Sequence, residues 1–559
     1  MASIVKKVKK GRAYYYAVES GRVNGKPRIV WQKYLGTVDA IVEQARSTTP
    51  PRPQETVIFE AGGVAALLGI AQRLGLVELI DEGVAKRDQG PSVGQYMVLA
   101  ALNRALAPCS KLQIGQWYEG TVLRRLWRFR ASLFSSQRYW DHMGMVSEEA
   151  IEEVQDRLVP RIEREFGIDA RILLYDTTNF FTFLATSNTR ARLAQRGHSK
   201  GKRHDLRQVG LALVVTREYQ VPLFHRTYPG NVPDVSLFPK LSEELIARYR
   251  TVARGCDEAT LVFDKGNVSE EVMERLTLSG THFVAALGAH RFREVVATPL
   301  EQFEEVAEFA GTRAFSTEAD LWGSRCRILV VYTESFFTQQ LSGVTQNLIA
   351  CQKNLQELAR RLARRHRGTR PSVHSVQKIV REILAAQFMK ELFRVAVEDD
   401  EGLPRLRYAL DHAALEKLTS ERLGKTILVT DHLRWSPADI ISAYRNLASI
   451  EDAFKHMKNT HYLHWQPAYH WTDQKLRVHA FYCVLALLLT TLARKVAAES
   501  GIDLSVPALL NELTAIHEVA IVYPEQTPAH RTHQITLTRM SPRQRKLAEC
   551  LELAKTLGR

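Results

Sequence analysis

The sequence predicts an α/β protein, and three patterns after residue 170 support this. RILLYDTTNFFTF (171–183) and QVGLALVVTREYQVPLFHRTY (208–228) are rich in the apolar and β-branched residues of buried strands. TLVFDKGNVSEEVMERL (260–276) predicts a strand, a turn at Gly266 and a helix that Ser269 caps. WSPADIISAYRNLASIEDAFKHMKN (435–459) predicts a helix with Ser436 as its cap. Strands that alternate with helices are typical of an α/β core.

The distribution of charge indicates a polyanionic partner. The chain carries a net charge of +15 and has a sequence pI near 9.5. Lysines and arginines gather in residues 1–34, 120–140, 190–207 and 360–370, where acids are few. An evenly basic surface without a specific partner would not show such clusters. Concentrated basic charge favours nucleic acid as the partner.

The N-terminal segment YYYAVESGRVNGKPRIVWQKYLG (14–36) predicts a β-hairpin. Two β-rich runs flank Asn24-Gly25, a pair that suits a type I′ turn. Its aromatic residues alternate with lysines and arginines, and Lys9 and Lys10 precede it. We expect residues 1–46 to contact DNA; the alternative is a small sheet whose aromatics only form its own core.

Residues 47–56 (STTPPRPQET) predict a linker because of their proline content. Helical periodicity follows over 57–165, where Ser147 and two glutamates mark a helix start. We expect a helical DNA-binding domain here, with Arg124 and Arg128 on one DNA-contacting face.

The apolar stretch AFYCVLALLLTTLA (480–493) is too short to cross a bilayer and predicts a buried helix. The N-terminus lacks the apolar core of a secretory signal. Six cysteines are scattered without a Cys-x-x-Cys pair, which argues against structural zinc and against a disulfide framework. We therefore expect a cytoplasmic protein without membrane association.

Two aspartates follow apolar strands at similar positions. Asp176 comes after Ile172–Tyr175, and Asp264 comes after the apolar run 261–263. If the two strands are neighbours, their carboxylates lie close together and repel unless a cation or a proton is present. Oxygen ligands select Mg²⁺ or Mn²⁺. Phosphoryl transfer with two metal ions would need a further acid.

The helix predicted after residue 436 offers that acid. Tyr444, Glu451 and Lys458 are spaced by seven residues, so they share one helix face. Apolar neighbours, Leu447 among them, predict that Glu451 faces the protein. A structural salt bridge on an amphipathic helix is the alternative for any single glutamate; three acids in suitable places favour a site.

The order YDTTNF, HSKGKRHDLRQVGLAL, YPGNVPD, LVFDKGN and YRNLASIEDAFKHMK resembles the bacterial insertion-sequence transposases of the DDE type. It is most similar to the group with a long insertion before the glutamate and a Tyr-Arg-Glu-Lys signature. The resemblance runs from about residue 165 to 500. The N-terminal hairpin that ends in YLG is also similar to that group.

The resemblance implies a ribonuclease-H-like catalytic core in which Asp176, Asp264 and Glu451 hold two Mg²⁺ ions, with Mn²⁺ as a substitute. The 186 residues between Asp264 and Glu451 imply a mostly β insertion. Tyr444 and Lys458 match the signature positions that contact phosphates. The expected order is a DNA-contacting hairpin (1–46), a linker (47–56), a helical DNA-binding domain (57–165), the first segment of the ribonuclease-H-like core (166–299), the insertion (300–425), the second segment of that core (426–500) and a helical tail with a possible dimer interface (501–559).

The signature shows one departure. Its arginine belongs four residues before the glutamate, where this chain has Leu447. Arg445 projects about 200° round the helix from that position, at about 100° per residue. Formation of a DNA hairpin on the excised end is tied to this arginine, so the departure affects the hairpin step and leaves strand cutting in place.

Further DNA contacts are expected from basic residues near these motifs. The loop HSKGKRH (198–204) lies between the first two core strands; a solvated basic loop is its alternative interpretation. The expected contacts are Tyr444, Arg445, Lys455, Lys458, His198, Lys200, Lys202, Arg203, Arg124, Arg128, Lys9 and Lys10.

The sequence thus predicts a transposase that cleaves the ends of its element and joins the freed 3′-hydroxyls to target DNA. The implied partners are double-stranded DNA, as terminal inverted repeats and target, and a second copy of the chain in a homodimer at the bacterial nucleoid. The alternatives are a metal-dependent nuclease that does not join, and a domesticated DNA-binding regulator. Joining activity separates the first two, and the presence of all three acids argues against the regulator.

Overall fold

The computed structural model describes residues 2–23, 26–46, 53–84, 89–185, 187–197, 203, 205–232, 244, 247–248, 259–289, 291–363, 371–400, 403–523 and 533–559. The chain separates into two compact units. Unit 1 holds residues 1–59 and 517–539, and unit 2 holds residues 60–516 and 540–559. Each unit is described by itself.

Unit 1 contains two small sheets. The first is antiparallel and consists of β1 (Ala2–Lys9), β2 (Arg12–Val23) and β3 (Lys26–Gly36), followed by α1 (Val38–Arg46). The pairing of β2 with β3 confirms the predicted hairpin, although its turn, Asn24-Gly25, lies outside the described residues. β1 was not predicted, and it pairs with β2 along its whole length.

The second sheet of unit 1 has the order β17-β16-β4. It joins β4 (Glu55–Glu60) to β16 (His517–Val522) and β17 (His533–Leu537), which are more than 450 residues away in the chain. The region 501–559 is therefore not purely helical as predicted. β16 and β17 pair with each other locally, whereas the pairing of β16 with β4 joins distant segments and is not revealed by local periodicity.

The N-terminal region of unit 2 is helical, as the periodicity predicts. Ser147 caps the longest of these helices, because its hydroxyl accepts a hydrogen bond from the Ala150 amide at 3.1 Å. The helices are α2 (Gly62–Arg73), α3 (Leu76–Glu82), α4 (Val93–Leu106), α5 (Ile114–Glu119), α6 (Leu123–Trp127), α7 (Ser136–Met145) and α8 (Glu148–Phe166), with a 3₁₀ turn at Ala131–Phe134.

A nine-stranded mixed sheet forms the centre of unit 2, with the order β10-β11-β12-β15-β9-β8-β5-β6-β7. β5, β6 and β7 form an antiparallel meander, while β8 and β9 run parallel to β5. The remaining four strands extend the sheet beyond β9 in antiparallel pairs. The strands are β5 (Ile172–Thr182), β6 (Arg207–Thr216), β7 (Pro222–Pro229), β8 (Thr260–Phe263), β9 (His282–Leu287), β10 (Glu304–Glu305), β11 (Thr312–Leu321), β12 (Ser324–Thr333) and β15 (Lys425–Thr430).

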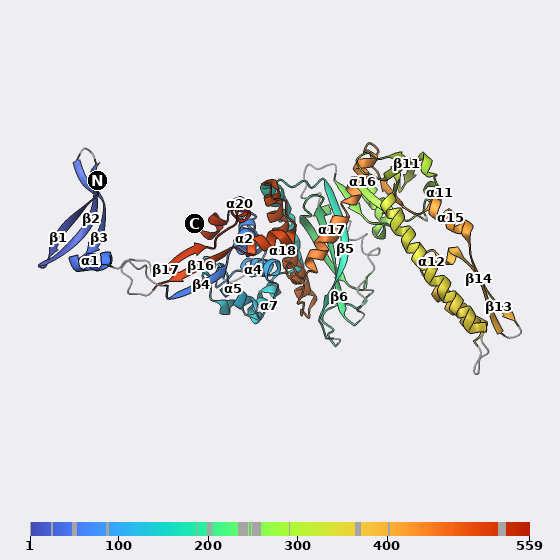
Figure 1. Cartoon of the computed structure of the whole chain (residues 1–559), viewed down its shortest axis with the longest axis horizontal. Helices are drawn as coiled ribbons and strands as arrows, with labels where there is room; N and C mark the ends of the chain where they lie inside the picture. The colour runs from blue at the N-terminus through green and yellow to red at the C-terminus, as the bar shows by residue number, and fades with distance from the viewer. Residues whose placement is uncertain are drawn as a thin grey trace. The chain divides into compact units, whose positions relative to one another are not determined.

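The region 300–425 is not mostly β, which corrects the expectation for the insertion. Beyond the sheet strands it contains a 30-residue helix, α12, with further helices and one hairpin. Leu355 and Leu358 on α12 are buried against Val376 and Val380, so this region has its own apolar core. The elements are α12 (Glu334–Ala363), α13 (Val373–Ile383), α14 (Met389–Leu392), α15 (His412–Glu421), β13 (Phe393–Asp400) and β14 (Leu403–Leu410), and Figure 1 shows α12 alongside the β13–β14 hairpin.

The predicted helix after Ser436 is two helices, α16 (Pro437–Arg445) and α17 (Ala448–Met457), with a break at Asn446 and Leu447. The Ser436 cap is confirmed, since its hydroxyl accepts a hydrogen bond from the Asp439 amide at 3.1 Å. The connecting and C-terminal helices are α10 (Glu270–Ser279), α11 (Arg293–Val296), α18 (Asp473–Glu499), α19 (Val506–Thr514), α20 (Pro542–Cys550) and α21 (Leu553–Leu557), with 3₁₀ turns at Lys265–Asn267 and Leu300–Gln302.

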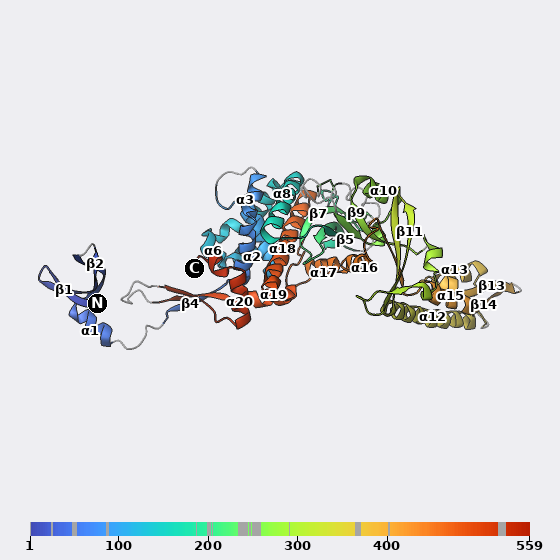
Figure 2. The ribbon, with the colours of Figure 1, turned by 90° about the horizontal axis from the view of Figure 1, so that it is seen from above.

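α18 is the central helix of unit 2. It packs against α4 and α8 on one side and β7 on another, and Figures 1 and 2 both show it between the N-terminal helices and the sheet. In the described portion of the chain, α18 is the one helix that by itself is long and apolar enough to cross a membrane; α2 and α3 meet that test only as a bent pair. Since 94% of its most apolar window is buried inside the protein, α18 is a core helix, and it contains the predicted segment 480–493.

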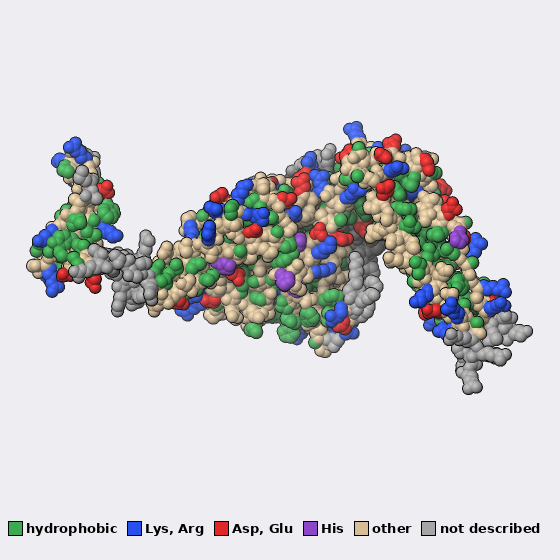
Figure 3. Space-filling model, in the orientation of Figure 1, with side chains coloured by type: hydrophobic (Ala, Val, Ile, Leu, Met, Phe, Trp, Pro, Cys, Tyr) green, Lys and Arg blue, Asp and Glu red, His purple; other side chains and the backbone are tan. Residues whose placement is uncertain are grey.

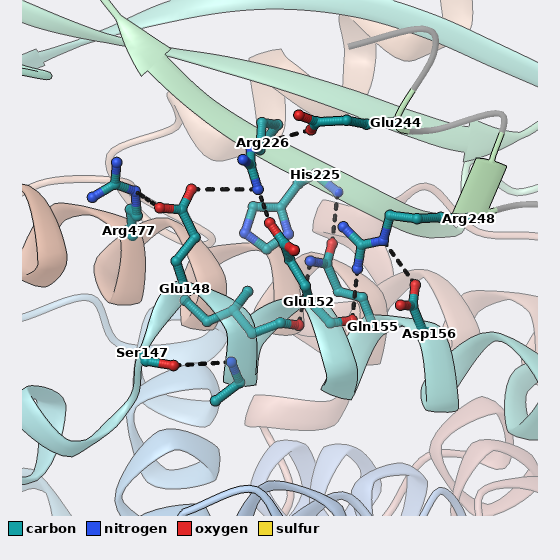
Figure 4. A network of polar contacts seen from close by, with 12 residues as sticks. Ser147, Glu148, Glu152, Gln155, Asp156, His225, Arg226, Glu244, Arg248 and Arg477 are labelled. Atoms are coloured by element: carbon teal, nitrogen blue, oxygen red, sulfur yellow. Dashed lines mark hydrogen bonds and ion pairs between the residues drawn. The ribbon is translucent and has the colours of Figure 1, made fainter. Parts of the chain in front are cut away.

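A network of ion pairs fastens α8 to β7 and α18 (Figure 4). Arg226 on β7 lies between Glu148 and Glu152 of α8, at 3.3 Å from the first and in direct contact with the second. Arg477 on α18 pairs with Glu148 at 2.9 Å, and Glu244 lies 3.6 Å from Arg226. The side chains are 26–49% exposed, so water partly screens these interactions.

Replacing Arg226 with leucine is expected to lower the free energy of unfolding by about 1–3 kcal/mol. The change leaves Glu148 and Glu152 close together without the guanidinium between them. Urea denaturation followed by circular dichroism measures the effect. The control is Arg325→Leu, whose partners are solvent-exposed and whose loss should cost about 0.5 kcal/mol or less. Equal destabilisation by both changes would contradict the role of the network.

Candidate active site

Asp176 lies in β5, and Asp264 directly follows the end of β8, the strand that pairs with β5. In the parallel pairing of β5 with β8, Ile172 lies opposite Thr260 and Leu174 opposite Val262. Two residues further along, the same register brings Asp176 level with Asp264, whose backbone is still extended. Adjacent strands lie about 4.8 Å apart, and residues at one level point to the same face. The two aspartates predicted from separate motifs therefore stand at equivalent positions, each two residues beyond the last pair of β5 and β8.

Asp176 lies within β5 and not at its end, which corrects the sequence interpretation. β6 pairs with β5 as far as Thr182, whereas β8 pairs only with residues 172–174. Asp176 thus stands where β5 loses its parallel neighbour but keeps its antiparallel one. Tyr175 is buried and Asp176 is half-buried. The strand therefore begins to leave the buried interior at Asp176, as the sequence suggested.

The helix pair α16–α17 is attached to both strands near the aspartates. The Tyr444 hydroxyl donates a hydrogen bond to Asp264 Oδ1 at 2.9 Å. The Lys458 ammonium donates to Thr178 Oγ1 at 2.7 Å and lies 5.3 Å from the centre of the Phe180 ring. Burial raises the pKa of Tyr444, and the Asp264 carboxylate raises it further, so Tyr444 acts as a neutral donor.

Glu451 lies between these two contacts in the chain, on α17, but its side chain is exposed. The prediction that it faces the protein is wrong, because Ile450, Phe454 and Met457 supply the buried face of α17. α17 packs against β5, so it lies beside the strand of Asp176.

The three predicted acids do not form a closed cluster in the structure. Among the described residues, the group of three His, Cys, Asp or Glu side chains with all ligand atoms within 4.8 Å of one another is His282, Asp431 and His432. Asp176 and Asp264 belong to neighbouring chain segments of the sheet, while Glu451 is exposed on α17, the helix that packs against β5.

The other two predicted DNA contacts on the helix pair, Arg445 and Lys455, also have protein partners. The Arg445 guanidinium donates to Thr312 Oγ1 at 2.9 Å and lies 4.3 Å from the centre of the Phe309 ring. Lys455 pairs with Asp452 at 2.8 Å on the exposed side of α17. Arg445 is thus tied to the segment that begins β11, and it does not replace an arginine at position 447.

The basic loop is only partly described. Arg203 is exposed and forms an ion pair with Asp205 at 2.7 Å. His198, Lys200 and Lys202 lie outside the described residues.

The remaining predicted contacts are at the surface of their own units. Arg124 pairs with Glu119 at 3.0 Å, and Arg128 is exposed with a positive φ of 58° at the end of α6. Lys9 and Lys10 are exposed at the turn between β1 and β2. Figure 3 shows lysines, arginines and apolar side chains together on this sheet, where Trp31 and Tyr34 are 49% and 52% exposed. Its aromatics are therefore not all used as a core.

Sequence analysis missed Thr178 and Phe180, although a signal was present. Side chains alternate along a strand, so residues 176, 178 and 180 share one face of β5. Thr178 contacts Lys458, and Phe180 stacks on the buried Trp465 with ring centroids 4.4 Å apart. On one face of β5, the motif YDTTNF therefore supplies the carboxylate of Asp176, the hydroxyl of Thr178 and the aromatic ring of Phe180.

A comparison with protein families matches residues 169–489, more than half of the chain, to the transposase DDE domain. The chain belongs to this family. The resemblance drawn from its motifs is confirmed at this level, and membership implies an enzyme that cleaves and transfers DNA. The match starts just before β5 and ends within α18, so it includes all three predicted acids.

Comparison with solved structures finds the cryo-EM structure of a piggyBac transposase synaptic complex with hairpin DNA. It is 9% identical, with a TM-score of 0.37, over 80% of this chain and 79% of that chain. A comparison with curated proteins gives no match.

Proposed function

We propose that this DDE transposase binds the ends of its insertion sequence, cleaves them by hydrolysis and joins the freed 3′-hydroxyls to target DNA. One observation carries the proposal: Asp176 and Asp264 share a level on neighbouring strands, and the segment bearing Glu451 is attached to both strands through Tyr444 and Lys458. The strand order β7-β6-β5-β8-β9, with its antiparallel meander and two parallel strands, supports a ribonuclease-H-like core.

The residues at this position fit a divalent cation. Two half-buried carboxylates at one level of adjacent strands repel each other unless a cation is shared, and both offer only oxygen ligands. Mg²⁺, or Mn²⁺ in its place, would be held by Asp176, Asp264 and Glu451 and would stabilise charge on the attacking and leaving oxygens. Tyr444 orients the Asp264 carboxylate. Lys458 offers a cation beside Thr178 for a DNA phosphate.

The DNA path is assigned from basic side chains. Lys9, Lys10, Arg124, Arg128, Arg203 and Lys458 are exposed, and many such phosphate contacts make binding strong and salt-dependent. We propose that two copies of the chain bridge the two element ends at the nucleoid. Leu447 is buried and Arg445 is bound elsewhere, so the proposed excision does not use an arginine at the signature position.

The test of the proposed function is an assay on the purified full-length chain with Mg²⁺ and a duplex carrying an element end, taken from the inverted repeats that flank the gene. The expected result is cleavage at the 3′ end of the element and its covalent joining to a second duplex. Cutting without joining would indicate a nuclease, and binding without cutting would indicate a regulator. Either result would overturn the proposal.

Replacing Tyr444 with phenylalanine is expected to slow cleavage about 5- to 20-fold. The loss of one hydrogen bond to a charged carboxylate corresponds to about 1–2 kcal/mol, while Asp264 itself remains. Single-turnover cleavage rates measure the effect, and Tyr469→Phe, at an exposed tyrosine, is the control. A rate equal to wild type would show that the contact with Asp264 does not position the carboxylate.

A further inference from the structure

A second cluster of possible metal ligands lies away from the proposed catalytic carboxylates. His282 begins β9, and Asp431 and His432 follow the end of β15, the strand that pairs with β9. One ligand atom from each of the three lies within 4.8 Å of the others, and all three side chains are half-buried. The topology thus brings two imidazoles and a carboxylate together where β9 begins and β15 ends, in the interior of the strand order.

His282 and Asp431 contact each other, and Asp431 and His432 each have a further polar partner outside the cluster. The Asp431 carboxylate lies 2.7 Å from His282 Nδ1 through one oxygen and accepts from the Phe283 amide at 3.0 Å through the other. The Thr260 hydroxyl lies 2.7 Å from His432 Nε2. Such outer partners orient the ligands of metal sites and set which histidine nitrogen is available.

Stacked rings further restrict the two histidines. His282 and His432 stack with centroids 4.3 Å apart, and Trp435 stacks on the other side of His432 at 3.9 Å and 4°. These stacks fix the planes of the two imidazole rings, and imidazole is a common metal ligand.

The donor set selects the ion. Two imidazoles and one carboxylate are a donor set typical of Zn²⁺, while Mg²⁺ prefers oxygen ligands only. We propose that His282, Asp431 and His432 form a Zn²⁺ site that is separate from the catalytic carboxylates.

The position in the sheet separates the two sites. Thr260, which contacts His432, begins β8, whereas Asp264 follows its end. Four residues of extended chain span roughly 13 Å. The Zn²⁺ site would connect β9 to the segment between β15 and α16, where the chain returns from the inserted region towards Tyr444. It would therefore stabilise the junction on which the helix pair depends.

The test uses the full-length chain, stripped with EDTA and titrated with Zn²⁺ against a chromophoric chelator. The wild type should bind one more Zn²⁺ than His282→Ala, His432→Ala and the isosteric Asp431→Asn, or bind at least ten-fold more tightly at this site. His374→Ala, at an exposed histidine, should bind as the wild type does. Zn²⁺ should also raise the thermal midpoint of the wild type, and excess Mg²⁺ should not compete.

Equal Zn²⁺ binding by the wild type and all three site variants would overturn the inference. Because a variant can fail to fold, X-ray absorption of Zn²⁺ on the wild type gives a second measurement. Imidazole and oxygen ligands without sulfur are expected, since the nearby Cys326 thiol is directed to the carbonyls of Leu321 and Ser324. Sulfur ligands around the bound Zn²⁺, or the absence of tightly bound Zn²⁺, would contradict the proposed site. The measurement needs no cleavage activity, so its outcome is independent of the proposed function.

Discussion

Replacing Asp264 with asparagine is expected to reduce Mg²⁺-dependent cleavage of an element end by at least about 1,000-fold, which corresponds to about 4 kcal/mol of transition-state stabilisation. Asparagine keeps the size of the side chain and can still accept the hydrogen bond from Tyr444. It removes the negative charge that a divalent ion requires. The fold and the contacts of the helix pair should therefore remain, while catalysis is lost.

Affinity for the DNA should change little in this variant, because it comes from many lysine and arginine contacts. Cleavage rates and a binding titration at one fixed salt concentration are compared for the wild type, Asp264→Asn and the control Asp503→Asn, at an exposed aspartate. The same loss is expected for Asp176→Asn, since the two carboxylates share one level of the sheet. If Asp264→Asn cleaved as fast as Asp503→Asn, the catalytic assignment would be wrong.

Replacing Trp465 with alanine is expected to lower the free energy of unfolding of unit 2 by about 3–5 kcal/mol. Trp465 is 1% exposed, stacks on Phe180 of β5 and meets His479 of α18 edge-on at 4.7 Å. Alanine would leave a cavity between the strand that carries Asp176 and the central helix. Urea denaturation followed by circular dichroism measures the change.

Trp465→Phe provides the matched comparison. The indole Nε1 has no hydrogen-bond partner among the described residues, so phenylalanine loses no bond and keeps the aromatic stack. It should cost about 1.5 kcal/mol or less. Trp471→Ala, at a tryptophan that is 48% exposed, should cost about 1 kcal/mol or less. A similar loss from all three changes would show that packing against Phe180 is not the cause.

The motifs allowed much of the site to be predicted. Asp176 and Asp264 each follow a run of apolar residues, and these runs are the buried stretches of β5 and β8. The seven-residue spacing predicted only that Tyr444 and Lys458 share a helix face; in the structure Tyr444 contacts Asp264 and Lys458 contacts Thr178, and Asn446 and Leu447 between the two helices are in the αR region. Caps at Ser147, Ser269 and Ser436 were predictable because a cap is a local hydrogen bond.

The same local rules failed where the outcome depended on partners. Glu451 was expected to be buried because apolar residues flank it, but α17 buries the neighbouring face. In the C-terminal region β16 pairs with the distant β4 as well as with β17, and the helices after β12 build a core of their own. The cluster of His282, Asp431 and His432 has no sequence signature, since 148 residues separate His282 from Asp431.

In this protein, interactions between residues close in the sequence determine which segments form strands and helices and where the helix caps are. The sequence alone also shows which acidic and basic residues belong to the family's motifs. Strand order, strand register and the burial of each helix face were decided only when distant segments packed together. The reason is physical: a cap or an apolar run acts over a few residues, whereas the pairing of β5 with β8 or of β9 with β15 depends on contacts between segments roughly 90 to 140 residues apart.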